Sequence, residues 1–331
     1  MATLSAANPT LVDLANLTLP NGMLAKDIID PLAQNNDIWA EAAIVEGNDG
    51  AGHKSVTTTG YPDTTWRKLY GGVPESKAQH AQVRDTCGML EAYATIDKAL
   101  ADLAGGSAAW RMTQESKFRE KLNQDIAYTF LYGDTAVNPE RFMGVAPRFN
   151  LSTANNGANV IKAGGSGADN ASIYLVGWHP TTCHFIYPKG SAGGLNVRDL
   201  GEQTVYDASS NPFQALRTHY KWDIGLAMPD WRYVVRICNI DISDLTKNAA
   251  SGADLVDLLI QAVERMPTDF RRTRPAIYAP QTIMSFLRRQ VSNRSNLFLT
   301  LDQVAGKSVV SFDGIPVRRL DQASIAEALV S

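Results

Sequence analysis

Residues 107–133, SAAWRMTQESKFREKLNQDIAYTFLYG, contain no proline and have glycines before and at their end. Their large apolar side chains recur at every fourth position and therefore share one helix face. These are Phe118, Leu122, Ile126 and Phe130. Ser107 is a suitable N-cap and Gly133 a suitable stop. At 1.5 Å per residue such a helix extends roughly 35 to 40 Å, so the stretch predicts a strut as wide as a domain.

A second amphipathic segment precedes this strut. Between Pro74 and Leu103 the apolar residues Met89, Tyr93 and Ile96 are spaced by four and three, and the same spacing continues to residue 103. This pattern predicts another helix, with Cys87 as a buried core thiol.

The segment from Ala42 to Tyr70 has the composition of a hairpin. The β-branched stretches AAIVE, SVTTT and TTWRKLY are separated by the turn sequences GNDGAG and GYPD. They predict two or three strands with few large apolar residues, too few to form a core of their own. We therefore expect the hairpin to project and to dock elsewhere.

The ends of the chain differ in character. Residues 1–37 are apolar but are interrupted by Pro20, Gly22 and Pro31, which predicts an extended arm that lies against another surface, such as another chain. Beyond Gly133 strand-like segments dominate up to residue 250. From Ser251 we expect a short amphipathic helix, the strand AIYAP, another helix and closing strands around VVSFDGIPVRRLD. The predicted class is α+β.

Composition excludes several classes of protein. The 331 residues are 44% hydrophobic and 20% charged, carry a formal charge of −3, and include three cysteines. These values argue against a disulfide scaffold and against binding of nucleic acid through overall positive charge. There is no apolar run of transmembrane length and no secretory signal in MATLSAANPT, so we expect no membrane contact.

Patterns suggestive of chemistry are weak. The sequence LDQVAGKS, residues 301–308, ends like a phosphate-binding loop but lacks its first glycine and is followed by a strand former, which predicts a hairpin turn at Gly306 instead. His179, Cys183 and His184 are metal-ligand types, but no further cluster supplies the remaining ligands. We expect no catalytic residue, cofactor or metal.

Charge is unevenly distributed. Seven arginines occur between Arg265 and Arg294 against a single acid, whereas the first 66 residues carry eight acids against two lysines. These charges are either solvated faces or the two sides of a contact between subunits, and the arginines could alternatively bind nucleic acid. The candidate intersubunit residues are Asp49, Lys54, Asp63, Arg271, Arg272 and Arg274.

Four blocks resemble one family in the same order. They are FLYGDTAVNPERFMGVAPRF, residues 130–149; HFIYPKGSAGGLNVRDLGEQTV; HYKWDIGLAMPDWRYVVRICNIDISDL; and RPAIYAPQTIMSFLRRQV with FDGIPVRRLD. Together they resemble the major capsid proteins of short-tailed double-stranded DNA bacteriophages, over about Trp39 to Asp321.

The resemblance implies the HK97-type capsid fold and a division of the chain. The parts would be an N-terminal arm (1–37), a hairpin called the E-loop (38–76), a P-domain (77–250) with its spine helix (107–132) and the strand-rich block, and an A-domain with closing strands (251–331). The block of strand-like segments that ends at residue 250 is large. An alternative is therefore an interrupted A-domain, made of separate parts of the sequence.

The resemblance also implies a role. The chain would assemble with itself, through pentamers and hexamers, into the icosahedral shell around the phage double-stranded DNA, without binding a specific sequence. Scaffold, portal and cement proteins would be its partners, the virion its location and the host cytoplasm its place of assembly. The alternatives are an enzyme of unknown chemistry with its site near Cys183 and His184, and a DNA-binding protein that uses the Arg-rich segment.

Overall fold

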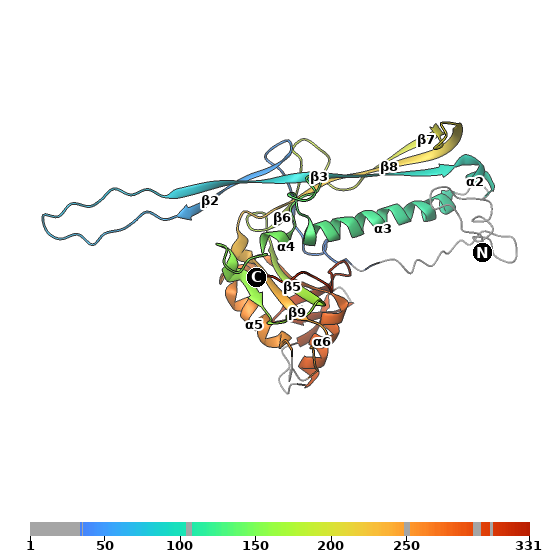
Figure 1. Ribbon diagram of the computed structural model, residues 1–331. Helices are drawn as coiled ribbons and strands as arrows, with labels where there is room; N and C mark the ends of the chain where they lie inside the picture. Colours follow the sequence, from blue (N-terminus) through green and yellow to red (C-terminus); the bar gives the residue numbers. More distant parts are fainter. Residues whose placement is uncertain (1–33, 35, 104–107, 248–251, 294–298, 305–306) are drawn as a thin grey trace. The chain divides into compact units, whose positions relative to one another are not determined.

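The computed structural model describes residues 34, 36–103, 108–247, 252–293, 299–304 and 307–331 (Figure 1). The chain divides into two compact units. The first unit comprises residues 1–34, 90–123 and 195–222, and the second comprises 35–89, 124–194 and 223–331. The arm expected over residues 1–37 lies, up to residue 33, outside the described residues.

Helices are few and strands are many, as expected for the α+β class. The helical elements are α2 (Lys98–Leu103), α3 (Ala108–Tyr132), α4 (Val145–Arg148), η1 (Gly157–Asn159), η2 (Trp231–Tyr233), α5 (Leu255–Arg265), η3 (Phe270–Arg272) and α6 (Gln281–Asn293). The strands are β1 (Ile44–Glu46), β2 (Gly52–Gly60), β3 (Gln79–Asp97), β4 (Val160–Lys162), β5 (Asn170–Trp178), β6 (His184–Tyr187), β7 (Asn196–Tyr206), β8 (Pro212–Ala227), β9 (Val234–Asp241), β10 (Arg274–Ala279), β11 (Leu299–Val304), β12 (Lys307–Phe312) and β13 (Ile315–Arg319).

A seven-stranded sheet forms the centre of the second unit. Its strand order is β11-β12-β13-β10-β5-β9-β4, with β10 parallel to β13 and antiparallel to β5. Every residue of β5 and β9 is buried, because both faces of the sheet are covered. The predicted strand AIYAP corresponds to β10, and the predicted helices around it correspond to α5 and α6.

Alternate residues of these strands supply two separate cores. Ile173 and Leu175 of β5 belong to a cluster that also contains the buried faces of α5 and α6. Trp178 points to the opposite side of β5, where its ring lies 5.6 Å from Phe130 of α3 and 5.2 Å from Phe185 of β6. The sheet is therefore a middle layer between a helical layer and an aromatic cluster.

The predicted strut is confirmed as α3. Leu122 and Ile126 are 3% and 1% exposed, as the spacing of apolar residues requires. In the first unit Leu122 packs with Ala94 of β3 and Tyr220 of β8. The predicted cap, Ser107, lies outside the described residues.

The helix predicted from Pro74 to Leu103 is wrong. Gln79–Asp97 is instead β3, and α2 alone is helical. The buried positions of its second half, Ala94 and Ile96, alternate with exposed ones such as Tyr93, which is the period of a strand. Cys87 consequently lies in a strand and is only partly buried, although burial still raises its pKa to about 11.

A hairpin is present, but of its predicted strands only SVTTT belongs to it, as part of β2, and its second strand, β3, lies beyond the predicted segment. β2 pairs with β3 in antiparallel register from Gly52 opposite Thr86 to Gly60 opposite Gln79. AAIVE forms β1, which pairs in parallel with β6 rather than with β2, and TTWRKLY forms no strand because no partner strand lies beside it. Residues 61–78 instead make a long connection between β2 and β3 (Figure 1).

The strand-rich block is divided between the two units. β4, β5 and β9 belong to the seven-stranded sheet, so residues on both sides of position 250 share that sheet. β7 and most of β8 belong to the first unit. β11 and β12 pair across the predicted turn, whose Gly306 is not among the described residues.

Candidate assembly surfaces

The connection between β2 and β3, residues 61–78, carries large apolar side chains that are fully open to solvent. Trp66 and Tyr70 are 101% and 106% exposed, and Tyr61 and Leu69 are 90% and 87% exposed. Apolar side chains scattered singly on a surface are common, but several together in one segment mark an interaction site. We call residues 61–78 the hairpin tip.

Two candidate contact residues lie at the base of the same hairpin and already interact with each other. The Asp49 carboxylate is 3.3 Å from Lys54 Nζ and 2.9 Å from Arg84 Nη2. The hydrogen bond from Lys54 is the main cause of the lowered pKa of Asp49. Asp49 and Lys54 therefore brace the turn that leads into β2.

The remaining candidate intersubunit residues differ in the interactions that they already make within the subunit. Asp63 lies in the hairpin tip, where its backbone carbonyl accepts a hydrogen bond of 2.9 Å from Ser76 Oγ. Arg271 of η3 is 2.6 Å from Asp313 in an exposed ion pair. Arg272 and Arg274 are exposed and form no ion pair within the described residues. In that same part of the chain no ion pair joins the hairpin to the Arg-rich segment.

Other acids of the acidic N-terminal region are also engaged. Glu41 forms a bidentate ion pair with Arg318 of β13, and Glu46 accepts a hydrogen bond of 2.9 Å from the backbone of Gly190. The acids before residue 34 lie outside the described residues. Among the described acids of the hairpin tip, Asp63 and Glu75 are outnumbered by three basic residues, so the tip itself is not acidic.

The surroundings of Cys183 and His184, the alternative enzyme site predicted from sequence, contain a buried polar cluster. Arg148 is 2.7 Å from Asp85, whose carboxylate also accepts a hydrogen bond from the Met228 backbone at 3.1 Å. Burial raises the pKa of the Cys183 thiol to about 12 and lowers that of His184 to about 4. Within the described residues no three His, Cys, Asp or Glu side chains are placed to hold a metal ion.

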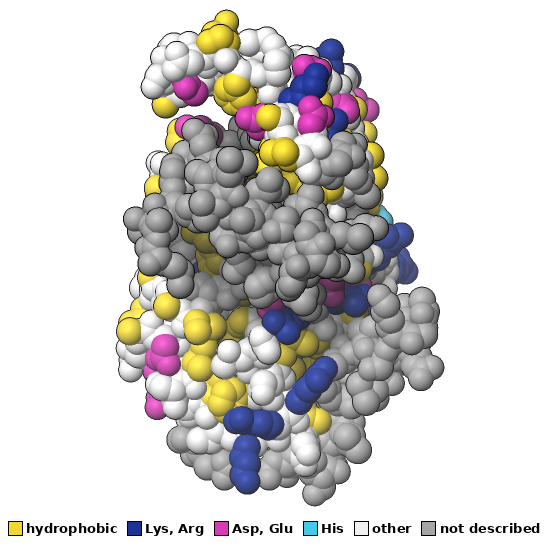
Figure 2. Space-filling model, turned by 90° about the vertical axis from the view of Figure 1, so that its right-hand side faces the viewer, with side chains coloured by type: hydrophobic (Ala, Val, Ile, Leu, Met, Phe, Trp, Pro, Cys, Tyr) yellow, Lys and Arg dark blue, Asp and Glu magenta, His cyan; other side chains and the backbone are white. Residues whose placement is uncertain are grey.

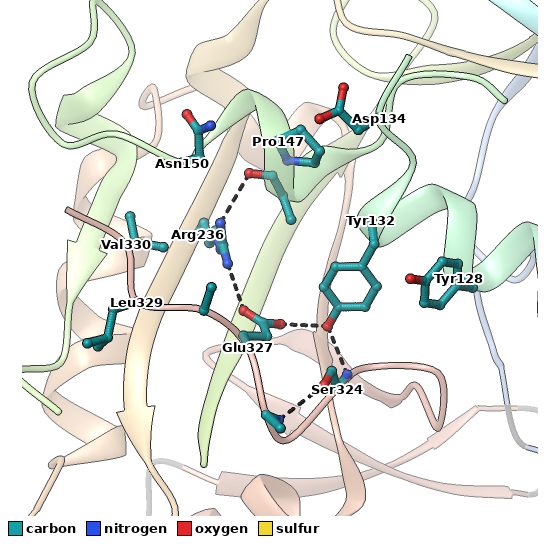
Figure 3. A pocket seen from close by; sticks show the side chains of 13 residues that line it. Tyr128, Tyr132, Asp134, Pro147, Asn150, Arg236, Ser324, Glu327, Leu329 and Val330 are labelled. Atoms are coloured by element: carbon teal, nitrogen blue, oxygen red, sulfur yellow. Dashed lines mark hydrogen bonds and ion pairs between the residues drawn. The ribbon is translucent and has the colours of Figure 1, made fainter. Parts of the chain in front are cut away.

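The last residues of the chain are held against the second unit by a buried ion pair (Figure 3). Arg236 of β9 lies 2.7 Å from Glu327, and the two side chains are 5% and 6% exposed. Arg236 also donates to Ser172 Oγ and to two backbone carbonyls, and Glu327 accepts a hydrogen bond of 2.5 Å from Tyr132. Asn239 exchanges two hydrogen bonds of 2.9 Å with the Val330 backbone. We call this arrangement the C-terminal clasp.

A cavity of about 430 Å³ adjoins the clasp. Tyr128, Tyr132, Asp134 and Pro147 form one wall, and Ser324 with residues 326–330 forms the other (Figure 3). The guanidinium of Arg236 already has protein partners on all its nitrogens, so none of these nitrogens is left without a partner for a ligand in the cavity.

The sequence matches the family described as major capsid protein GP7 over residues 20–331. The chain belongs to this family. It is also similar to the solved structure of bacteriophage Epsilon15, with 37% sequence identity, a TM-score of 0.75 and complete coverage of both chains.

More distant capsid structures match as well. The capsid of bacteriophage JBD30 shares 11% identity at a TM-score of 0.46, with 96% of this chain and 99% of that one covered. The capsid of the native GTA particle shares 12% identity at a TM-score of 0.46, with 72% and 99% covered. A search of curated proteins found no match.

Membership of the family confirms the main predictions from the sequence. This is a bacteriophage major capsid protein with the α+β, HK97-like fold, a structural component of the virion that assembles with itself into a shell. Neither the enzyme nor the DNA-binding alternative is supported. No helix in the described ranges is both long enough and apolar enough to cross a membrane.

Two features of this capsid protein were missed by reasoning from sequence. Trp66 and Leu69 were assigned to a strand, although the neighbouring GYPD and YGG sequences could have indicated a loop. The clasp had no local signal, because Arg236 and Glu327 are 91 residues apart.

Proposed function

We propose that this major capsid protein assembles through pentamers and hexamers into an icosahedral shell around phage double-stranded DNA, with the hairpin tip of each subunit lying over a neighbouring subunit. The observation that carries this proposal is the solvent exposure of Tyr61, Trp66, Leu69 and Tyr70. Burying each apolar side chain of this size is worth roughly 1.5 to 3 kcal/mol. A surface of this kind favours a partner, and in a shell the partner is another copy.

Weak contacts are sufficient in such an assembly. A subunit held by several neighbours leaves only when all its contacts open together, so each contact can be as weak as about −4 kcal/mol, a millimolar affinity. A long connection without regular secondary structure also suits contacts that must fit rings of five and of six, which differ slightly in angle.

The domain assignment is part of the proposal. We assign the hairpin β2–β3 with residues 61–78 to the E-loop, and the seven-stranded sheet with α5 and α6 to an A-domain. The spine helix of the P-domain would be α3. This assignment makes β4, β5 and β9 part of the A-domain, which corresponds to the interrupted A-domain considered from sequence.

A charged contact between the hairpin and the Arg-rich segment of a neighbour is proposed in a narrower form. Asp49, Lys54 and Arg271 have partners in their own subunit, so Asp63, Arg272 and Arg274 are the residues best able to form it. Exposed ion pairs contribute only about 0.2 to 1 kcal/mol each, so this contact would orient the tip more than hold it.

Partners and place of assembly follow from the same role. We propose that scaffold, portal and cement proteins act with the shell, that it is built in the host cytoplasm, and that the protein has no enzymatic activity and needs no cofactor. Burial raises the pKa of the Cys183 thiol to about 12 and makes it a poor nucleophile, which argues against an enzyme site at this residue.

Replacement of apolar side chains in the tip tests the proposal. The Trp66→Ser/Tyr70→Ser variant should fold normally but yield no shells, because its fully exposed positions contribute little within the subunit. Electron microscopy and sedimentation of the purified protein would measure shells, and a thermal melt would measure folding. Trp66→Phe/Tyr70→Phe is the matched control and should assemble. Normal particles from the serine variant would refute the role of the tip, and absence of shells from the native chain would refute the assembly itself.

A further inference from the structure

The outer surface of α5 carries an acidic stripe. Asp257, Ile260, Gln261 and Glu264 are spaced by three and four residues, and all are exposed, with Ile260 at 38%. The opposite side of the helix is buried in the core of the second unit. We define these four residues as the acidic stripe.

Helix stability explains Asp257, which also accepts a hydrogen bond of 2.7 Å from Gln261, but it does not explain Glu264. Asp257 lies in the first turn of α5, where an acid is favourable, but Glu264 lies in the last turn, where the helix dipole disfavours a negative charge. Arg265, the neighbouring cation, donates hydrogen bonds to the backbone carbonyls of Ala158 and Val160 instead of pairing with Glu264. Glu264 is therefore left at an unfavourable place with its charge directed to solvent.

The outer surface of α6 is basic. Gln281, Ser285, Arg288 and Ser292 follow the same helical spacing and are exposed, with Arg289 beside them. Arg289 lies over the ring of Phe286, 4.1 Å from its centre. No acid occurs within α6, and neither Arg288 nor Arg289 forms an ion pair among the described residues. We define Ser285, Arg288, Arg289 and Ser292 as the basic stripe.

The two stripes are held at a fixed spacing. Gln290 of α6, 1% exposed, accepts a hydrogen bond of 3.0 Å from the backbone of Leu255 at the start of α5. Its amide nitrogen donates to the carbonyls of Ala253 and Thr246 at 3.1 and 3.0 Å. Figure 2 shows the side of the molecule on which α6 lies, where Lys and Arg side chains stand out in the lower part of the view.

We propose that the acidic stripe of α5 binds the basic stripe of α6 in a second copy of this chain, head to tail, as one of the contacts that close a ring of subunits. The inference rests on the proposed assembly through rings. A contact between different surfaces of identical subunits propagates around a ring. Stripes of opposite charge on different helices supply both halves of such a contact, with the exposed Ile260 as its apolar centre.

Charge reversal of each stripe tests the contact. Arg288→Glu/Arg289→Glu and Asp257→Lys/Glu264→Lys should each lower the fraction of protein found in shells at least tenfold, measured by sedimentation and electron microscopy. The two variants change the net charge in opposite directions. A general effect of net charge would therefore act oppositely in them, whereas loss of the contact affects both alike.

Restoration provides the matched control. The variant with all four reversals has the native net charge and should again form shells, as should the two reversed variants expressed together. Neutral versions, Arg288→Gln/Arg289→Gln and Asp257→Asn/Glu264→Gln, should lose assembly only in part. If the thermal melt of a reversed variant differs from that of the native chain, these neutral versions replace it in the test.

Particular results would overturn the inference. Efficient shell formation by either reversed variant, or failure of the folded four-reversal variant to assemble, would exclude the contact while leaving the shell itself intact. Native mass spectrometry of assembly intermediates should show rings, and two-fold dimers dependent on the stripes would overturn the head-to-tail arrangement. If the native chain forms no shells, the proposed function fails instead.

Discussion

Removal of Glu327 should destabilise the second unit strongly. The Glu327→Ala change leaves the guanidinium of Arg236 without its carboxylate at a position where both side chains are about 5% exposed. Loss of one partner from a buried ion pair costs about 3 to 5 kcal/mol, because the remaining charge is not solvated. Tyr132 and Tyr174 lose a hydrogen-bond acceptor in the same substitution. We therefore expect a loss of about 3 to 5 kcal/mol in the free energy of unfolding.

Urea unfolding of subunits dissociated from shells, followed by circular dichroism, would measure this loss. For an m-value of about 1 to 3 kcal/mol per molar urea, the midpoint should fall by roughly 1 to 5 M. Asp313→Asn is the matched control, because it removes the charge of the exposed pair with Arg271, whose side chains are 60% and 51% exposed, and Asn tolerates the positive φ of 50° at this position. That variant should change stability by less than about 1 kcal/mol.

A paired replacement separates the charge from the packing. Arg236→Met/Glu327→Leu removes both charges and should recover most of the stability lost in Glu327→Ala, since apolar residues often replace a buried ion pair without loss. If Glu327→Ala unfolds at the same urea concentration as the native subunit, the clasp is not a buried ion pair in solution and the reasoning is wrong.

Two further predictions concern other buried positions. Leu122→Asp should place an unpaired charge at a site that is 3% exposed and cost several kcal/mol, so that the subunit misfolds; a thermal melt equal to the native one would contradict the packing of α3. His184, beside His53, Asp85 and His179, has its pKa lowered to about 4 by burial, so the unfolded chain binds its proton first as the pH falls. Stability contributed by neutral His184 should be complete above about pH 6.5 and decline by at most about 1.4 kcal/mol per unit down to about pH 4. His184→Phe should flatten this part of the pH profile in urea titrations, and an unchanged slope would count against the burial of the imidazole.

The parts of the fold with a strong local pattern were predictable. The apolar residues of α3 recur at every fourth position without interruption, and the structure buries Leu122, Ile126 and Phe130. α5 and α6 follow the same logic, because one face of each helix enters a single core. The amphipathic period alone was sufficient for these elements.

β3 was predicted to be a helix because the spacing of its apolar residues fits one face of a helix as well as a strand. Met89, Tyr93 and Ile96 are spaced like one face of a helix, yet Met89 and Tyr93 are 74% and 46% exposed while Ile96 is 8% exposed. The strand is 19 residues long, several times the usual length, so the prior for a helix of that length was stronger than that for a strand. Its pairing with β2 and β8 is a tertiary property that no window of sequence contains.

The charges of the assembly surfaces could likewise be predicted only in part, because their number is visible in the sequence but their partners are not. The sequence displays the excess of acids and of arginines, but Asp49, Glu41 and Arg271 satisfy much of it within the subunit. Which charges remain for a neighbour depends on the fold. The stripes on α5 and α6 became visible only when the buried faces of both helices were known.

Apolar and charged surfaces should therefore contribute differently to the shell. Each exposed ion pair adds about 0.2 to 1 kcal/mol and is screened within roughly 8 Å at physiological salt, whereas each large apolar side chain of the hairpin tip adds roughly 1.5 to 3 kcal/mol on burial. The strength of the shell should come mainly from residues such as Trp66 and Leu69. The stripes should mainly select which surface of a neighbour is bound, because reversing one stripe replaces attraction by repulsion at every ring contact. Charge then decides how the subunits are oriented, and apolar burial decides how firmly they stay.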